Sequence, residues 1–235
     1  MSGTAEQYFF APGPIEGFYS FDPFESKHIR KVLRKQPGDS IWLTDGKGNL
    51  YEAEIVRMDK QTVNVVVRQK RSFPLPEKRL HIYIAPPKLP VRFEWFLEKA
   101  VELGVWHITP IITRYTQIVK WKAERFERII ITAMKQSKRV FKPVLDSPQT
   151  LDRLFHLNIS GYVALCDTPT HYTGEYSRQK STAVFIGPEG GFSPEEKKQF
   201  LHRQIKPISL SDARLRTETA AITAACLFYS SSLIK

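Results

Sequence analysis

Residues 182–193 read TAVFIGPEGGFS, an apolar run that ends in a glycine-rich loop. The run 182–186 has the length and composition of a buried strand. Three glycines then fall within positions 187–191, and glycine permits positive φ and close approach of a ligand to the backbone. The letters SPEE at 193–196 supply an N-cap, a proline at the first helical position and a capping-box glutamate. This stretch therefore predicts a strand, a ligand loop and a helix in that order.

A glycine loop that leads into a helix can hold a phosphate. This loop matches neither standard nucleotide motif, because it lacks the Gly-Lys-Ser/Thr ending of the P-loop and the G-x-G-x-x-G spacing of dinucleotide folds. Glu189 lies inside it, where its carboxylate would repel phosphate but could bind a ribose or face a cationic ligand. The alternative is a turn that only reverses the chain.

A second loop follows at residues 209–220, SLSDARLRTETA, again with a strand end, a short loop and a helix start. Together the two stretches resemble the paired motifs of the bacterial 16S ribosomal RNA uridine N3-methyltransferases. This family belongs to the SPOUT superfamily of S-adenosylmethionine enzymes. The resemblance places the two loops on opposite sides of one cofactor pocket.

The resemblance covers nearly the whole chain. Residues 92–105, RFEWFLEKAVELGV, are similar to the first helix of the family's catalytic domain. QSKR at 136–139 resembles the end of its central helix, with Lys138 where glycine is usual, and HIRKVLR at 28–34 resembles its N-terminal signature. The resemblance implies methylation of N3 of a uridine in 16S rRNA or the small ribosomal subunit, with S-adenosylmethionine as cofactor, no metal and a homodimer.

The fold that follows is α/β, with a boundary at the proline-rich stretch 71–77. We expect a small β-rich domain over 1–72, which in the family is a PUA-like barrel. The alternation of strands and helices over 73–235 predicts a parallel sheet covered on both faces, and the resemblance implies a C-terminal trefoil knot there. Strands are expected at 40–44, 50–58, 62–69, 80–85, 106–112, 162–166, 182–186 and 208–210, and helices at 90–103, 122–139, 194–202 and 217–231.

Charge favours a polyanionic partner. The 235 residues carry 35 Lys and Arg against 24 Asp and Glu, a net charge of +11 with a sequence pI near 9.6. No apolar segment is long enough to span a membrane, and the uncharged run 219–234 is expected to form a buried or subunit-facing helix. The first residues lack a secretion signal, so we expect a cytoplasmic protein.

The spacing of the Cys and His residues indicates neither a disulfide nor a metal site. The two cysteines, Cys166 and Cys226, lie sixty positions apart, so neither a disulfide framework nor a CxxC site is expected. We expect both thiols in the core. The six histidines show no paired ligand spacing, and no metal site is predicted.

The site residues follow from the resemblance and from the chemistry of methyl transfer. The cofactor-binding residues it implies lie in three loops: Leu165, Cys166, Gly187, Pro188, Gly190, Gly191, Leu210, Ser211 and Leu215. Arg216 is the candidate catalytic cation, because a fixed positive charge would stabilise the deprotonated uracil, with an ion pair to Glu218 or Glu189 as the alternative. Glu189 is expected to bind ribose or assist proton removal.

Two basic stretches are expected to bind RNA phosphates. Lys27, Arg30, Lys31 and Arg34 fall at helical spacing, with Ile29, Val32 and Leu33 available to pack inward. A second stretch runs over 120–142, where Arg139 is expected to contact the target nucleotide. Either stretch could instead be a solvated helix face.

Two other functions stay open on the sequence alone. One is an RNA-binding ribosome-assembly factor that keeps the fold without turnover. The other is a SPOUT methyltransferase that acts on transfer RNA. The intact loop motifs favour an enzyme, and the N-terminal signature favours the ribosomal substrate.

Overall fold

The computed structural model describes residues 7–13, 15–117, 120–166, 168 and 180–230. The chain forms two compact units. The first combines Met1–Leu75 with Met134–Lys142, and the second combines Pro76–Ala133 with Pro143–Lys235. The division near residue 75 falls inside the proline-rich stretch, whereas the return of 134–142 to the first unit has no counterpart in the sequence patterns.

The first unit is built on one five-stranded sheet of order β1-β3-β4-β5-β2. Only the β1 to β3 pairing is parallel. Its core contains the buried side chains of Phe9, Leu43, Tyr51, Ile55 and Val65. Its strands are β1 (Tyr8–Phe10), β2 (Phe18–Ser20), β3 (Ser40–Thr44), β4 (Asn49–Met58) and β5 (Val63–Ser72).

A short helix, α1 (Pro23–Lys27), continues into a π-helical turn at His28–Val32. Ile29 is fully buried and Leu33 packs against the core, as the sequence predicts. Val32 is 65% exposed, so its predicted inward packing is wrong. The wider π turn changes the angular spacing that an α-helix would give these side chains.

Segment 134–142 joins the first unit through backbone bonds. The N–H of Lys142 donates to the carbonyl of Gly46 at 2.8 Å, and the N–H of Gly48 donates to that of Val140 at 2.9 Å. Phe141 lies so close to Gly48 that a Cβ there would meet its ring at 2.4 Å. Gly48 also has φ +92°, so both space and conformation require glycine.

The second unit contains a seven-stranded sheet of order β12-β10-β11-β6-β7-β8, with β9 paired to β7. Every pairing in it is parallel, which confirms the predicted α/β class. Its strands are β6 (Arg79–Ile84), β7 (His107–Ile112), β8 (Val144–Leu145), β9 (Gln149–Thr150), β10 (Gly161–Ala164), β11 (Ser181–Ile186) and β12 (Lys206–Ile208).

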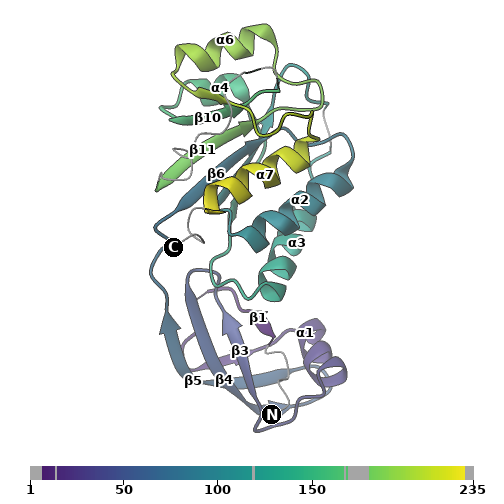
Figure 1. The fold of residues 1–235 in the computed structure, drawn as a ribbon. Helices are drawn as coiled ribbons and strands as arrows, with labels where there is room; N and C mark the ends of the chain where they lie inside the picture. Colours follow the sequence, from purple (N-terminus) through teal and green to yellow (C-terminus); the bar gives the residue numbers. More distant parts are fainter. Residues whose placement is uncertain (1–6, 14, 118–119, 167, 169–179, 231–235) are drawn as a thin grey trace. The chain divides into compact units, whose positions relative to one another are not determined.

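Helices cover both faces of this sheet. In Figure 1, α2 and the yellow α7 lie side by side, and α7 packs against β6 and β11. On the other face, residues of α4 and α6 pack with Tyr83 and Phe185 in one apolar cluster. The helices of this unit are α2 (Pro90–Leu103), α3 (Ala123–Gln136, whose last residues count with the first unit), α4 (Leu151–Phe155), α6 (Pro194–His202) and α7 (Thr217–Ser230).

The two cysteines differ from the sequence prediction. Cys166 and Cys226 are exposed, so the expectation of core thiols is wrong: Cys166 follows the end of β10, and Cys226 lies off the buried face of α7 formed by Ala221, Ala224, Ala225 and Phe228. Among the described residues, no helix is both long and apolar enough to cross a membrane.

Candidate active site

A cavity of about 300 Å³ opens where β10, β11 and β12 end. These strands are neighbours in the sheet and run parallel, so their carboxyl ends lie on one edge, the usual place for ligands in open α/β sheets. The loops after all three strands line the cavity, together with the first turn of α7.

The glycine loop after β11 folds as a tight turn closed by the N–H of Gly191, which donates to the carbonyl of Pro188 at 2.8 Å. Gly191 adopts φ +74°. A Cβ on Gly190 would come within 3.2 Å of Tyr115. The missing side chains therefore leave backbone exposed to the cavity, as the sequence predicts for a ligand loop.

Helix α6 fixes the far end of this loop. Ser193 and Glu196 form the predicted capping box, each side chain accepting from the other's backbone N–H at 3.2 and 2.8 Å. Glu196 also accepts from the N–H of Arg114, which lies beyond β7, at 2.8 Å. The cap thus links the glycine loop to the neighbouring loop of the sheet edge.

The second loop is fastened to the first. Thr217, the first residue of α7, donates from Oγ1 to the carbonyl of Gly187 at 3.1 Å. Arg214 donates from its guanidinium to the carbonyl of Glu189. Within the second loop, Ser211 accepts from the N–H of Ala213 at 3.1 Å. These bonds hold the two cavity walls in a fixed relation.

The acidic groups near the cavity also have partners. The carboxylate of Glu189 accepts from the backbone N–H of Lys88 at 3.1 Å. Glu218 is buried in the first turn of α7 and forms an ion pair with Arg92 of α2 at 3.6 Å. A buried carboxylate requires such a partner, so this pair anchors the start of α7 on α2.

All nine residues predicted to bind the cofactor line the cavity: Leu165, Cys166, Gly187, Pro188, Gly190, Gly191, Leu210, Ser211 and Leu215. Glu189 lines it as well. The sequence interpretation missed Arg214 and Thr217, which also line it. Both stand within the second motif, so their position beside Leu215 and Arg216 is the signal that could have identified them.

Arg216 is exposed and is absent from the lining residues. It lies between Leu215 and Thr217, which do line the cavity. The alternative role in an ion pair is not found, because within the described part of the chain Glu218 pairs with Arg92 and Arg216 forms no ion pair.

The lining residues fit S-adenosylmethionine. The volume lies at the lower end of the range for small-molecule sites. Leu165, Leu210 and Leu215 would offer apolar contact to the adenine, and the backbone exposed by the glycine loop would bind its polar edges. Glu189 would add a carboxylate to the same lining.

The predicted RNA-binding cations lie in the first unit. Lys27, Lys31 and Arg34 are exposed. Arg30 donates to the carbonyls of Asp59 at 3.2 Å and Lys60 at 3.0 Å, so it holds the β4 to β5 turn. The four do not share one α-helical face as predicted, because α1 ends at Lys27 and Arg34 lies beyond the π turn with φ +54°.

Arg139 is exposed and belongs to segment 134–142 of the first unit. Lys138, which precedes it in the motif at 136–139, has φ +54°.

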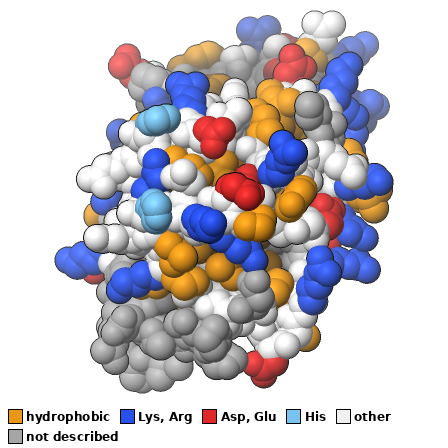
Figure 2. All heavy atoms as spheres, turned by 90° about the horizontal axis from the view of Figure 1, so that it is seen from above, with side chains coloured by type: hydrophobic (Ala, Val, Ile, Leu, Met, Phe, Trp, Pro, Cys, Tyr) orange, Lys and Arg blue, Asp and Glu red, His pale blue; other side chains and the backbone are white. Residues whose placement is uncertain are grey.

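Lys and Arg side chains are spread over the face shown in Figure 2, and Asp and Glu are sparser there. Such a surface suits a polyanion.

Comparison with known proteins identifies both units. Residues 74–228 match the family model of the RNA methyltransferase domain, and residues 23–68 match that of the RNA methyltransferase PUA domain. A probable rRNA-methyltransferase from Porphyromonas gingivalis is 35% identical, with a TM-score of 0.89 over 95% of this chain and 97% of that one.

Two further relatives agree. A putative methyltransferase from Legionella pneumophila, solved with bound SAM, is 30% identical, with a TM-score of 0.85 over 97% of this chain and 98% of that one. Ribosomal RNA small subunit methyltransferase E from Rickettsia conorii is 26% identical over 84% of this chain and 83% of its own length. The chain belongs to the family of RNA methyltransferases that carry a PUA domain.

Proposed function

We propose that this chain is an S-adenosylmethionine-dependent methyltransferase that modifies N3 of a uridine in the 16S rRNA of the small ribosomal subunit. The observation that carries the proposal is the cavity at the ends of β10, β11 and β12, whose lining includes all nine residues expected to bind the cofactor. The relatives support the substrate class, since several bear the name ribosomal RNA small subunit methyltransferase E.

When bound, S-adenosylmethionine supplies an electrophilic methyl group on its sulfonium. The chain's own task is to bind and orient the two reactants. We place the adenosine between the loop after β10, the glycine loop and the loop that precedes α7. The trefoil knot implied by the SPOUT resemblance would be formed by these last strands and loops.

The reacting uracil must lose its N3 proton before it can attack the methyl carbon. The resulting charge spreads over the carbonyl oxygens, where a fixed cation lowers the barrier. We assign this role to Arg216, which follows the lining residue Leu215 and has no ion-pair partner among the described residues. Glu189, which lines the cavity, is assigned to the ribose or to removal of the proton.

The RNA is expected to bind through its phosphates. Lys27, Lys31, Arg34 and Arg139 are exposed and would supply affinity that falls with salt. Arg30 would add to it while it holds the β4 to β5 turn. Selectivity requires an unpaired uridine extruded into the site, because N3 of a paired uridine is occupied by its hydrogen bond. We also propose a homodimer and a cytoplasmic location, where ribosomal subunits are available.

Methylation assays test the proposal directly. The protein and labelled cofactor are incubated with undermethylated small subunits, free 16S RNA and transfer RNA, and products are mapped by reverse transcription, which stops at N3-methyluridine. We expect label in the ribosomal substrates with one defined stop. If no RNA is labelled, the enzyme assignment fails and the remaining function is that of an assembly factor without turnover. Label only in transfer RNA would exclude the ribosomal assignment.

A further inference from the structure

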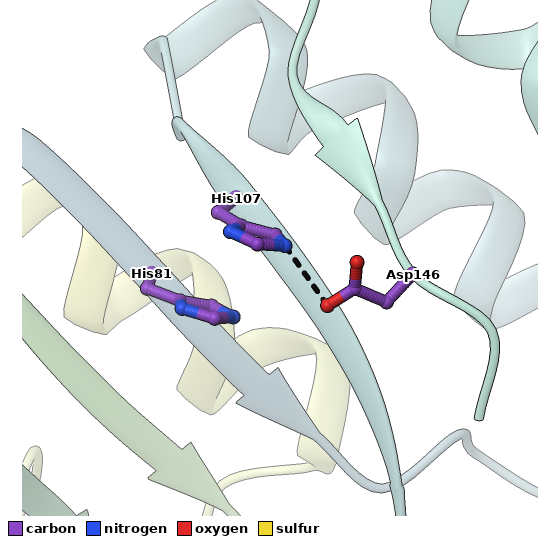
Figure 3. A group of neighbouring side chains, drawn as sticks. All are labelled: His81, His107 and Asp146. Atoms are coloured by element: carbon purple, nitrogen blue, oxygen red, sulfur yellow. Dashed lines mark hydrogen bonds and ion pairs between the residues drawn. The ribbon is translucent and has the colours of Figure 1, made fainter. Parts of the chain in front are cut away.

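Three polar side chains from separate parts of the sequence meet on the face of the sheet that α4 and α6 cover. His81 of β6 and His107 of β7 are directly paired in the parallel register. Asp146 follows β8, where its N–H donates to the carbonyl of Ile108 at 3.0 Å. All three side chains are partly buried. Figure 3 shows both imidazole rings with a nitrogen edge toward the carboxylate.

The geometry of this cluster is compact. The two rings stack with centroids 3.9 Å apart and planes within 3°. Nε2 of His107 lies 2.9 Å from Oδ2 of Asp146. Thr109 donates to the same oxygen at 2.5 Å, so its own oxygen accepts from Nε2 of His81 at 2.7 Å. Both imidazoles are therefore linked to one carboxylate oxygen, His107 directly and His81 through the hydroxyl of Thr109.

We propose that His81, His107 and Asp146 bind a divalent transition-metal ion of the zinc class. Their candidate ligand atoms lie within 4.8 Å of one another. Two imidazoles and one carboxylate suit zinc, cobalt or nickel. This inference stands independently of the proposed function.

Binding requires the two imidazole side chains to rearrange. A tetrahedral zinc about 2.0–2.1 Å from each ligand holds the ligand atoms about 3.3 Å apart. The two stacked rings must therefore turn until both Nε2 atoms face the ion, and His107 must draw back slightly from Oδ2 of Asp146, which is 2.9 Å away. Each ring proton moves from Nε2 to Nδ1, and water or the Thr109 hydroxyl completes the shell.

The location indicates a structural ion. His107 is the first residue of β7 and His81 lies in the first half of β6, whereas the cofactor cavity opens at the opposite ends of the parallel strands. An ion there would tie β6, β7 and the segment after β8 together. It would stabilise the sheet by mass action and would take no part in methyl transfer.

Titration of the full-length, untagged, chelator-treated protein with Zn²⁺ tests the site. Calorimetry should show one ion per chain, with a rise in melting temperature. His107→Gln and Asp146→Asn, which keep hydrogen-bonding groups, should each weaken binding at least about tenfold. His202→Ala is the matched control, because His202 is an exposed histidine on α6, and it should bind zinc like the wild type.

Cobalt distinguishes the source of any signal. Co²⁺ held by these residues should give the visible bands of a four-coordinate nitrogen and oxygen site, without the intense near-ultraviolet band of thiolate ligation. This spectrum decides the matter even if a variant fails to fold. The proposal is overturned by absence of saturable binding, by a six-coordinate or thiolate spectrum, or by unchanged zinc affinity in a folded His107→Gln protein.

Discussion

The hydroxyl of Thr217 donates a 3.1 Å hydrogen bond to the carbonyl oxygen of Gly187, and so joins the first residue of α7 to the first residue of the glycine loop. Thr217 is buried and lines the cavity. The bond connects two walls that come from positions thirty residues apart. The relation between the two loops is thus fixed by the protein before any ligand binds, which lowers the cost of ordering them on binding.

Thr217→Val keeps the shape of the side chain and removes this donor. We expect a loss of about 1 kcal/mol in unfolding free energy, because the part-buried carbonyl of Gly187 loses its partner, and a several-fold weaker affinity for S-adenosylmethionine. Urea denaturation and calorimetry measure the two effects. Thr219→Val, at an exposed position of the same helix, should change neither. Equal behaviour of the two variants would show that the Thr217 bond does not organise the site.

Arg216→Ala is expected to lower kcat about 100-fold, the usual cost of removing one group that stabilises developing charge, with little change in cofactor affinity. Single-turnover methylation and calorimetry separate these quantities. Arg216→Lys should recover part of the rate. Wild-type turnover in Arg216→Ala would remove Arg216 from the mechanism.

Arg214→Ala is expected to give the opposite pattern. Its guanidinium donates to the carbonyl of Glu189 and lines the cavity, so its loss should loosen the glycine loop and weaken cofactor binding more than kcat. Lys198→Ala, exposed on α6, is the control and should leave both values unchanged. If Arg214→Ala lowers kcat more than it weakens cofactor affinity, Arg214 is the catalytic cation and not a support of the glycine loop.

Local signals predicted the elements whose ends carry a cap. The helices expected at 90–103 and 194–202 have these bounds in the structure, since prolines begin both, Gly104 ends the first with φ +86° and a capping box starts the second. The strand expected at 208–210 is instead Lys206–Ile208. The observed strand includes Pro207, which is tolerated because β12 is an edge strand.

The cavity was predictable because its residues fall in two short motifs and a strand end, each contiguous in sequence. The cluster of His81, His107 and Asp146 was not. Its members come together only through the parallel register of β6 and β7 and the return of the chain at β8. The fastening of 134–142 to the first unit likewise depends on tertiary bonds to Gly46 and Gly48, which no local pattern encodes.

Lys138→Gly should stabilise the protein. Lys138 has φ +54° just after α3 ends at Gln136, a conformation that strains a side chain and suits the glycine usual at helix C-termini. Relief of about 1–2 kcal/mol of left-handed strain exceeds the roughly 0.5–1 kcal/mol that the extra freedom of glycine costs, so we expect a net gain of up to about 1 kcal/mol in unfolding free energy, measured as a higher urea midpoint. Lys138→Ala keeps the strain and should show no such gain. A stabilisation of equal size in both variants would assign the effect to the lost charge.

Asp59 should make the free energy of unfolding depend on pH. Its carboxylate accepts from the N–H groups of Thr62 at 2.7 Å and Gln61 at 2.8 Å and from the Thr62 hydroxyl at 2.8 Å, which closes the β4 to β5 turn. These bonds, that from the Thr62 N–H foremost, lower its pKa below 3.8. A carboxylate whose pKa is depressed by folding stabilises the protein above its unfolded value and loses that contribution as pH falls through the folded value.

Asp59→Asn removes the titration while keeping an acceptor for the turn. Urea unfolding from pH 7 down to pH 3 should therefore show a higher unfolding free energy for the wild type than for Asp59→Asn. This difference should be constant near neutrality and should decrease below about pH 4. Glu16→Gln removes an exposed carboxylate of the same unit and should follow the wild-type curve throughout. A constant difference between wild type and Asp59→Asn across the range would mean that the turn binds the carboxyl in both protonation states, and that acid acts on the first unit elsewhere.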